Sequence, residues 1–399
     1  MKTSYFYRSL LVATAFVFLL GVAGCGLPRN QVPLDRIADA RPVGMGAIRF
    51  WEIGYRSDVK TGSDGSSDCS FLALSGGGAN GAFGAGFLNG WSASGTRPTF
   101  RVVTGISTGS LIAPLAFLGP KYDLKLKQYY TTLRTKDLLS IEGLLGLGIP
   151  PLFTGESYAS TKPMQKLIAQ LIDQEIVEAV AAEYAKGRRL YVGTTNLDAQ
   201  RFMVWDMGAI ASSGNPDALK LFRKVMLASA SVPGGFPPVY FDVEVDGKKY
   251  DEMHVDGGVI TGAFGYGPAL FKEQSGESLK RGVCSLYVIR NGKLASEKKL
   301  MSRRVIPIVA RSFGTLMKAH SWGDLYRMYA MAKNDNVDFN YVSIPDDFVA
   351  KGKELFDPVE MNRLFEMGYA MAESGYEWQK DIPGFGKKSG SEWIWTPSR

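Results

Sequence analysis

The amino-acid sequence predicts an α/β fold, with a central, mostly parallel sheet covered by helices on both faces. Short apolar runs that resemble buried strands recur at 71–74, 100–105, 189–197 and 284–290. Stretches with helical character separate them, and glycine-rich turns mark several of the junctions. This alternation of strand and helix is typical of a parallel-rich sheet sandwiched between helices.

The other elements follow in chain order. Residues 47–55 resemble an edge strand, and the polar stretch 57–68 resembles a flexible loop. A helix is expected at 110–118, bent by Pro114. Apolar residues recur at helical spacing from Thr161 to Gly187, which predicts one helix that ends at the glycine. No internal repeat is evident, so residues 47–399 are expected to form a single domain.

The first 24 residues have the pattern of a secretory signal peptide. Lys2 and Arg8 precede an uncharged, mostly apolar run at 9–24, which is short for a membrane-spanning helix. Small residues then lead into Cys25, and this junction resembles the lipobox of bacterial lipoproteins. We therefore expect cleavage before Cys25, lipidation of its sulfur, and a tether at 25–46. An ordinary cleaved signal and a retained membrane anchor are the alternatives.

The charge balance is mildly basic. The chain has 46 Lys and Arg against 39 Asp and Glu, a formal charge of +7, which falls to +5 when Lys2 and Arg8 are removed. This excess suits an anionic lipid surface without demanding one, and no nucleic-acid partner is expected. Gly26 stands where an inner-membrane retention signal would often have Asp. Resemblance to sorted lipoproteins therefore favours the outer membrane of a bacterial cell envelope.

Cysteine and histidine are scarce. Besides Cys25 there are only Cys69 and Cys284. An exported protein can form a disulfide, but a buried free thiol is the commoner fate of a strand cysteine such as Cys284. The two histidines and the absence of CxxC or HExxH spacing argue against a metal site. No metal and no organic cofactor are expected.

A glycine-rich loop, GGGANG, directly follows the strand at 71–74. Gly76, Gly78 and Gly81 have the spacing of a dinucleotide-binding loop, which also requires an acidic residue about 20 positions downstream. The next acidic residue after the loop is Asp123, although Arg97 leaves room for a phosphorylated cofactor. The dinucleotide interpretation is therefore weak.

A second motif indicates a different use of the loop. Gly105 and Gly109 flank Ser107 in GISTG, between a predicted strand and a predicted helix, as a nucleophile elbow requires. The alternative role for Ser107 is a helix cap or turn. A serine nucleophile needs backbone N–H donors for the oxyanion that it creates. Gly76, Gly77 and Gly78 are expected to supply them, aided by a helix that starts near Ala79.

The base that activates the serine is less obvious. His320 alone has the chain order of an α/β-hydrolase triad, but its surroundings are those of an ordinary helix histidine. His254 is expected to be a strand residue just before Asp256, Gly257 and Gly258. An aspartate before glycine is commonly a turn residue.

Taken in order, GGGANG, GISTG and DGG resemble the motifs of patatin-like phospholipases, and the resemblance covers residues 71–260. It implies a patatin-like fold and a Ser-Asp dyad without histidine, in which Ser107 is the nucleophile and Asp256 the base. Many family members have Arg or Lys just after the glycines, whereas this chain has Ala79 and Asn80.

The resemblance implies hydrolysis of a lipid ester at a membrane to which Cys25 tethers the protein. A catalytically inactive patatin-fold scaffold is the alternative, and the oligomeric state stays open. The apolar, glycine-containing stretch 138–153 suggests either plain core or a mobile flap that meets acyl chains.

Overall fold

The computed structural model describes residues 29–52, 69–138, 160–265 and 284–383. The predicted signal peptide, Cys25, the loop at 57–68 and nearly all of the stretch 138–153 lie outside these ranges. No helix within the described ranges combines the length and the apolar character that crossing a membrane requires.

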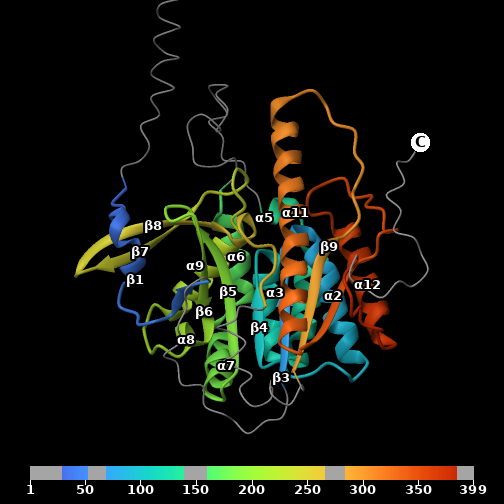
Figure 1. The fold of residues 1–399 in the computed structure, drawn as a ribbon, viewed down its shortest axis with the longest axis horizontal. Helices are drawn as coiled ribbons and strands as arrows, with labels where there is room; N and C mark the ends of the chain where they lie inside the picture. The colour runs from blue at the N-terminus through green and yellow to red at the C-terminus, as the bar shows by residue number, and fades with distance from the viewer. Residues whose placement is uncertain (1–28, 53–68, 139–159, 266–283, 384–399) are drawn as a thin grey trace, which may run out of the picture.

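Ten strands of the described residues form one sheet (Figure 1). Their bounds are β1 Arg41–Pro42, β2 Arg49–Trp51, β3 Cys69–Leu74, β4 Val102–Gly105, β5 Arg189–Asn196, β6 Arg201–Asp206, β7 Val239–Val245, β8 Lys248–Asp256, β9 Cys284–Lys293 and β10 Asp338–Ile344. The main path runs β1-β7-β8-β5-β4-β3-β9-β10, while β6 joins β5 to β2. The pairs from β5 to β10 along this path are parallel, and the others are antiparallel.

Helices cover both faces of the sheet, so the predicted α/β class is confirmed. The helix bounds are α2 Gly81–Ala93, α3 Thr108–Leu118, α4 Asp123–Thr132, α5 Thr135–Leu138, α6 Lys162–Leu171, α7 Gln174–Ala185, α8 Met207–Ala211, α9 Ala218–Ser229, α11 Val305–Asn334 and α12 Pro358–Glu373. Short 3-10 turns lie at η1 Leu34–Asp39, η2 Gly78–Asn80, η3 Pro120–Tyr122 and η5 Gly257–Val259.

Side chains of β3 point alternately into two apolar clusters, one on each face of the sheet. Leu72 and Leu74 enter the apolar cluster that α2, α3 and α12 cover, whereas Phe71 and Ala73 enter the cluster beneath α11. Successive strand side chains point to opposite faces, and every one of these four is apolar because both faces are buried.

The predicted single helix from Thr161 to Gly187 is instead two helices, α6 and α7. The chain breaks at Ile172 and Asp173, and the Asp173 carboxylate accepts the Ile176 N–H at 3.0 Å as an N-cap. An aspartate that caps a helix start competes with continuation of the preceding helix. The predicted edge strand at 47–55 is shorter, and its β2 portion pairs with β6 at the margin of the sheet.

The described part of the predicted tether, residues 29–46, packs against the folded body. Strand β1 pairs with β7. The Arg29 guanidinium forms ion pairs with Asp198 at 2.8 Å and with Asp251 at 2.6 Å. Two carboxylates on one guanidinium favour a fixed position over a free coil, so residues 29–46 do not form the extended tether that was predicted for them.

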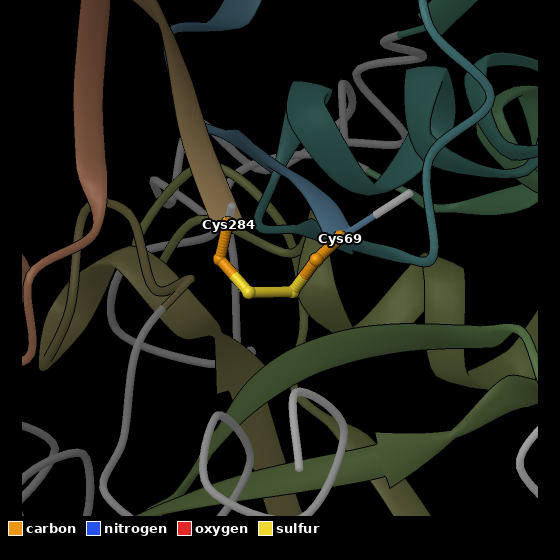
Figure 2. The surroundings of a disulfide bond; sticks show 2 residues. All are labelled: Cys69 and Cys284. Carbon is orange, nitrogen blue, oxygen red and sulfur yellow. A yellow bond between two sulfur atoms is a disulfide. The ribbon is translucent and has the colours of Figure 1, made fainter. Parts of the chain in front are cut away.

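Cys69 and Cys284 form a disulfide, contrary to the expectation of a free buried thiol (Figure 2). They are the opposed first residues of the neighbouring strands β3 and β9, and their Cα atoms lie 4.5 Å apart. Sequence separation hides this proximity, because only the pairing of the two strands brings the thiols together.

Candidate active site

Ser107 lies on a sharp turn between β4 and α3. Its φ of 54° and ψ of −126° place a non-glycine residue in a strained conformation. The flanking glycines are sterically required, because a Cβ on Gly105 would lie 2.4 Å from the Gly109 carbonyl oxygen. One on Gly109 would lie 2.3 Å from the Leu74 carbonyl oxygen. This is the geometry of a nucleophile elbow.

The backbone around Ser107 is held by two other serines. The Ser107 N–H donates to Ser229 Oγ at 3.0 Å, and the Ser229 hydroxyl donates to the Gly193 carbonyl at 2.7 Å. The Ser110 hydroxyl donates to the Ser107 carbonyl at 2.6 Å. Ser229 ties the elbow to β5, a role that the sequence did not reveal.

Strand β5 brings Asp256 to the elbow. On β5, Val192 is paired with Gly105, the last residue of β4, and Thr194 is paired with Asp256, the last residue of β8. Because β6 occupies the other edge of β5, β4 and β8 share one edge and their ends meet there. Asp256 at the end of β8 and Ser107, two residues beyond the end of β4, therefore lie close together, as predicted.

Asp256 is fully buried, and burial raises the pKa of its carboxyl to about 7. Interactions with the Ser107 hydroxyl and the Gly258 N–H lower that pKa and offset only part of the effect. The Gly258 N–H donates to Oδ1 at 2.7 Å. Within the described part of the chain, Asp256 Oδ2 is buried and has no hydrogen bond of standard geometry. A carboxyl with this pKa can accept a proton near neutral pH.

The predicted oxyanion loop needs one correction. The Gly76 N–H donates to the Gly262 carbonyl at 3.0 Å, so Gly76 has no free donor in this arrangement. The Gly77 and Gly78 N–H groups have no acceptor among the described residues. Gly78 has a φ of 57° and, like Ser107 and Thr108, it lines the cavity at the site. The Thr108 N–H is a further candidate donor, because it directly follows the nucleophile in the elbow.

Helix α2 begins at Gly81, directly after the turn η2, close to the predicted start near Ala79. The remaining motif glycines allow close packing. A Cβ on Gly81 would lie 2.2 Å from Thr108 Oγ1, and one on Gly257 would lie 2.6 Å from the Gly193 carbonyl oxygen. A Cβ on Gly258 would lie 2.6 Å from the terminal methyl of Met317 in α11. These glycines therefore set the spacing between the loop, the elbow and the aspartate.

Asn291 and Asp324 hold the glycine loop from distant parts of the chain, and sequence analysis missed both. The Asn291 side chain donates to the Ser75 carbonyl at 2.8 Å and accepts the Gly84 N–H at 3.1 Å. The Asp324 carboxylate accepts the Gly262 N–H at 2.6 Å, and Gly262 in turn accepts the Gly76 N–H. No local motif marks these two residues, which belong to β9 and α11.

An apolar cavity of about 260 Å³ opens beside Ser107. Apart from Gly78, Ser107 and Thr108, its walls are almost entirely apolar or aromatic: Leu111, Tyr129, Tyr130, Leu133, Leu138, Met164, Ala230, Val232, Gly235, Phe236, Leu355 and Phe356. A cavity with such walls suits an alkyl chain rather than a polar ligand.

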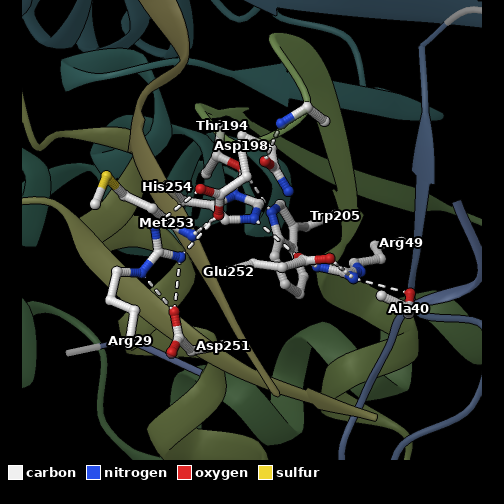
Figure 3. A network of polar contacts seen from close by, with 12 residues as sticks. Arg29, Ala40, Arg49, Thr194, Asp198, Trp205, Asp251, Glu252, Met253 and His254 are labelled. Carbon is white, nitrogen blue, oxygen red and sulfur yellow. Dashed lines mark hydrogen bonds and ion pairs between the residues drawn. The ribbon is translucent and has the colours of Figure 1, made fainter. Parts of the chain in front are cut away.

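The two histidines do not serve the site. His320 is exposed on α11, as expected for a helix histidine. His254 is a buried residue of β8, where its ring contacts Glu252 at 3.2 Å and Thr194 at 2.9 Å (Figure 3). Burial lowers the pKa of His254, and Glu252 also forms a 2.5 Å ion pair with Arg49. His254 is thus part of a structural network with both ring nitrogens engaged.

The described ranges contain no group of three or more His, Cys, Asp or Glu side chains that could hold a metal ion. Gly76 to Gly78 also lack the acidic ribose partner that a dinucleotide requires, as the sequence showed.

Comparison with known proteins defines the class. Residues 72–264 match the family model of patatin-like phospholipases, so the chain contains a patatin-like phospholipase domain, a class of lipid hydrolase. Among solved structures it is similar to VipD from Legionella pneumophila, with 14% identity and a TM-score of 0.37 over 76% of this chain and 67% of that one. No curated protein matches the sequence.

Proposed function

We propose that this protein is a serine-dependent lipid acyl hydrolase that uses Ser107 and Asp256 as a catalytic dyad. The observation that carries the proposal is the meeting of β4 and β8 on one edge of β5, which joins a strained serine to a buried carboxyl with a raised pKa. Perturbed carboxyl groups of this kind cluster at functional sites.

The geometry supports a two-step acyl transfer. Ser107 Oγ attacks the ester carbonyl carbon while its proton passes to Asp256, and the carbonyl oxygen becomes an oxyanion. The amides of Gly77, Gly78 and Thr108 stabilise that charge. Collapse of the intermediate breaks the ester C–O bond, and the alcohol leaves with the proton from Asp256. Water then attacks the acyl-enzyme and gives its proton to Asp256. When the bond between the acyl carbon and Ser107 Oγ breaks, Asp256 returns that proton to Oγ, so the acid leaves and both residues regain their starting states.

The cavity supports an ester substrate with an alkyl chain. Its apolar walls lie directly beside Ser107, so a bound chain would present its carbonyl carbon to the nucleophile. A phospholipid, a lysophospholipid and a neutral ester all carry such a chain.

Membrane tethering through a lipidated Cys25 is part of the same proposal. Arg29, only four residues later, is fixed to Asp198 and Asp251, so the anchor would hold the body close to the bilayer. Gly26 stands where an inner-membrane retention signal would often have Asp, which supports an outer-membrane location in a bacterial cell envelope. Cys25→Ser should abolish incorporation of radiolabelled fatty acid. Wild-type protein without fatty acid would refute the lipoprotein proposal.

A fluorophosphonate probe together with a screen of lipid esters tests the dyad. Ser107→Ala should abolish probe labelling, and both Ser107→Ala and Asp256→Asn should lower hydrolysis by roughly three orders of magnitude. Ser92→Ala and the exposed Asp242→Asn are the matched controls and should keep wild-type rates. Folded wild-type protein that neither labels nor hydrolyses any ester would instead support the inactive scaffold.

A further inference from the structure

Helix α11 has two unlike halves. Its C-terminal half buries Leu325, Met328 and Ala332 against the sheet. Its N-terminal half extends past the other described elements into solvent (Figure 1). There Val305 is 76% exposed, Ile308 50%, Val309 61% and Leu316 59%. Apolar residues exposed together on one short segment are a sign of an interaction surface.

These apolar residues share one side of the helix. Val305, Ile308, Val309 and Leu316 are spaced as i, i+3, i+4 and i+11, which places them on one stripe along a helix with 3.6 residues per turn. Arg304, at the helix N-cap, Arg311 and Lys318 repeat at intervals of seven and form a separate basic stripe.

The segment is also strongly biased in charge. From Lys298 to Gly323 there is no Asp or Glu, while six positions are basic: Lys298, Lys299, Arg303, Arg304, Arg311 and Lys318. Lys318 forms an ion pair with Glu297 at 3.3 Å. The other five basic side chains have no carboxylate partner among the described residues. Cations beside an exposed apolar stripe are the pattern of helices that lie in the interface of an anionic membrane.

The exposed half of α11 ends next to the site. Met317, one residue beyond the apolar stripe, packs against Gly258 at the Asp256 turn. Asp324, two turns further along, holds Gly262 beneath the glycine loop. At 1.5 Å of rise per residue, the stripe from Val305 to Leu316 lies within about 18 Å of that contact. A surface bound by this stripe would therefore lie close to Ser107 and its cavity.

We propose that residues 298–316 form an interfacial docking element, which binds the surface of a bilayer containing anionic phospholipid and brings the active site to it. The apolar stripe enters the acyl boundary while the basic residues face the headgroups. This deepens the proposed function by naming an aggregated, anionic lipid surface as the place of catalysis, but the docking itself requires no hydrolysis.

An environment-sensitive fluorophore tests the docking on the full chain. Val309→Cys and Leu124→Cys are each labelled with a nitrobenzoxadiazole thiol reagent, with unsubstituted protein as the labelling blank. Leu124 is the matched control, because it is 66% exposed and lies at the start of α4, beyond the end of α3 that is remote from Ser107. In phosphatidylglycerol vesicles the label at position 309 should shift to the blue and be quenched by brominated acyl chains, whereas the label at 124 should not.

Two groups of substitutions separate the contributions. Exchange of Lys298, Lys299, Arg303 and Arg304 for Gln should weaken binding to phosphatidylglycerol vesicles, measured by fluorescence titration, by about fivefold per charge. It should reduce hydrolysis of anionic vesicles and leave hydrolysis of a short soluble ester unchanged. The double variant Val305→Ser with Val309→Ser should weaken binding to phosphatidylcholine vesicles and to phosphatidylglycerol vesicles by a similar factor. Circular dichroism checks folding.

The outcomes separate the two proposals. Equal responses of the labels at 309 and 124, or a response at 309 that depends on protein concentration without vesicles, would overturn the docking proposal, the latter by indicating a second copy as the partner. A specific response at 309 in a protein that hydrolyses no ester would support docking and refute the hydrolase.

Discussion

Asn291 and Ser75 lie 216 positions apart in the sequence and are joined by two hydrogen bonds. The Asn291 backbone N–H donates to Ser75 Oγ, and the Asn291 side-chain amide donates to the Ser75 carbonyl, both at 2.8 Å. Ser75 is the residue that precedes the glycine loop, so β9 fixes the start of the candidate oxyanion hole.

Replacement of Asn291 by Ala should therefore impair catalysis more than binding. The loop would lose its fixed position, and preorganised donors are worth roughly 3 kcal/mol each, so we expect kcat to fall by about ten- to a hundredfold with KM nearly unchanged. Steady-state kinetics on a short ester measure both. Asn340→Ala is the control, because Asn340 is equally buried but bonds to Asp338 instead. Equal losses of kcat in both variants would contradict a positioning role.

The activity should rise with pH through about 7. Asp256 must be ionised to accept the Ser107 proton, and its pKa is raised to about 7 by burial. Below about pH 7, the rate with a neutral soluble ester should therefore fall as expected for protonation of a single group. A rate that is flat from pH 5 to 8 in stable protein would exclude Asp256 as the base.

The same group should destabilise the folded protein as pH rises. Its folded pKa of about 7 exceeds the unfolded value of 3.8, so the folded state binds the proton more tightly between these values. The stability that Asp256 contributes is fully present below about pH 3.8 and is lost by about pH 7, at about 1.4 kcal/mol per pKa unit. Asp256→Asn should thus be more stable than wild type at pH 8, by urea unfolding. A destabilised Asp256→Asn at that pH would contradict this.

His254 and His320 should affect different properties from Ser107. His320→Ala should be almost silent, because the side chain is exposed. His254→Ala should lower the free energy of unfolding by about 2–4 kcal/mol, since it leaves a cavity and removes a partner from buried Glu252. Both should keep most of their activity per folded molecule. A folded His320→Ala protein as inactive as Ser107→Ala would restore a histidine-dependent mechanism.

The disulfide should contribute to stability rather than to chemistry. It closes a separation of 215 residues, and loss of a native disulfide typically costs about 2–5 kcal/mol. Cys69→Ala with Cys284→Ala should unfold at lower urea concentration and retain activity at 25 °C. Unchanged stability of the double variant would show that β3 and β9 hold together without the bond.

The α/β class and the positions of the two motif turns could be predicted from the amino-acid sequence. Apolar runs and glycine turns are local signals, and the elbow at Ser107 needs Gly105 and Gly109 for steric reasons that act within a few residues. The order of the glycine loop, the elbow and the aspartate was likewise readable, and all three lie within residues 72–264, which match the family model.

Which groups lie in contact could not be predicted from local sequence. The disulfide, the engagement of the Gly76 amide by Gly262, and the clamps from Asn291 and Asp324 all depend on strand pairing or helix packing between distant segments. The pKa of Asp256 is also a tertiary property, because complete burial sets it and no local pattern specifies burial. Local sequence encodes turns and periodicity, whereas contacts over hundreds of positions depend on how the whole sheet is assembled.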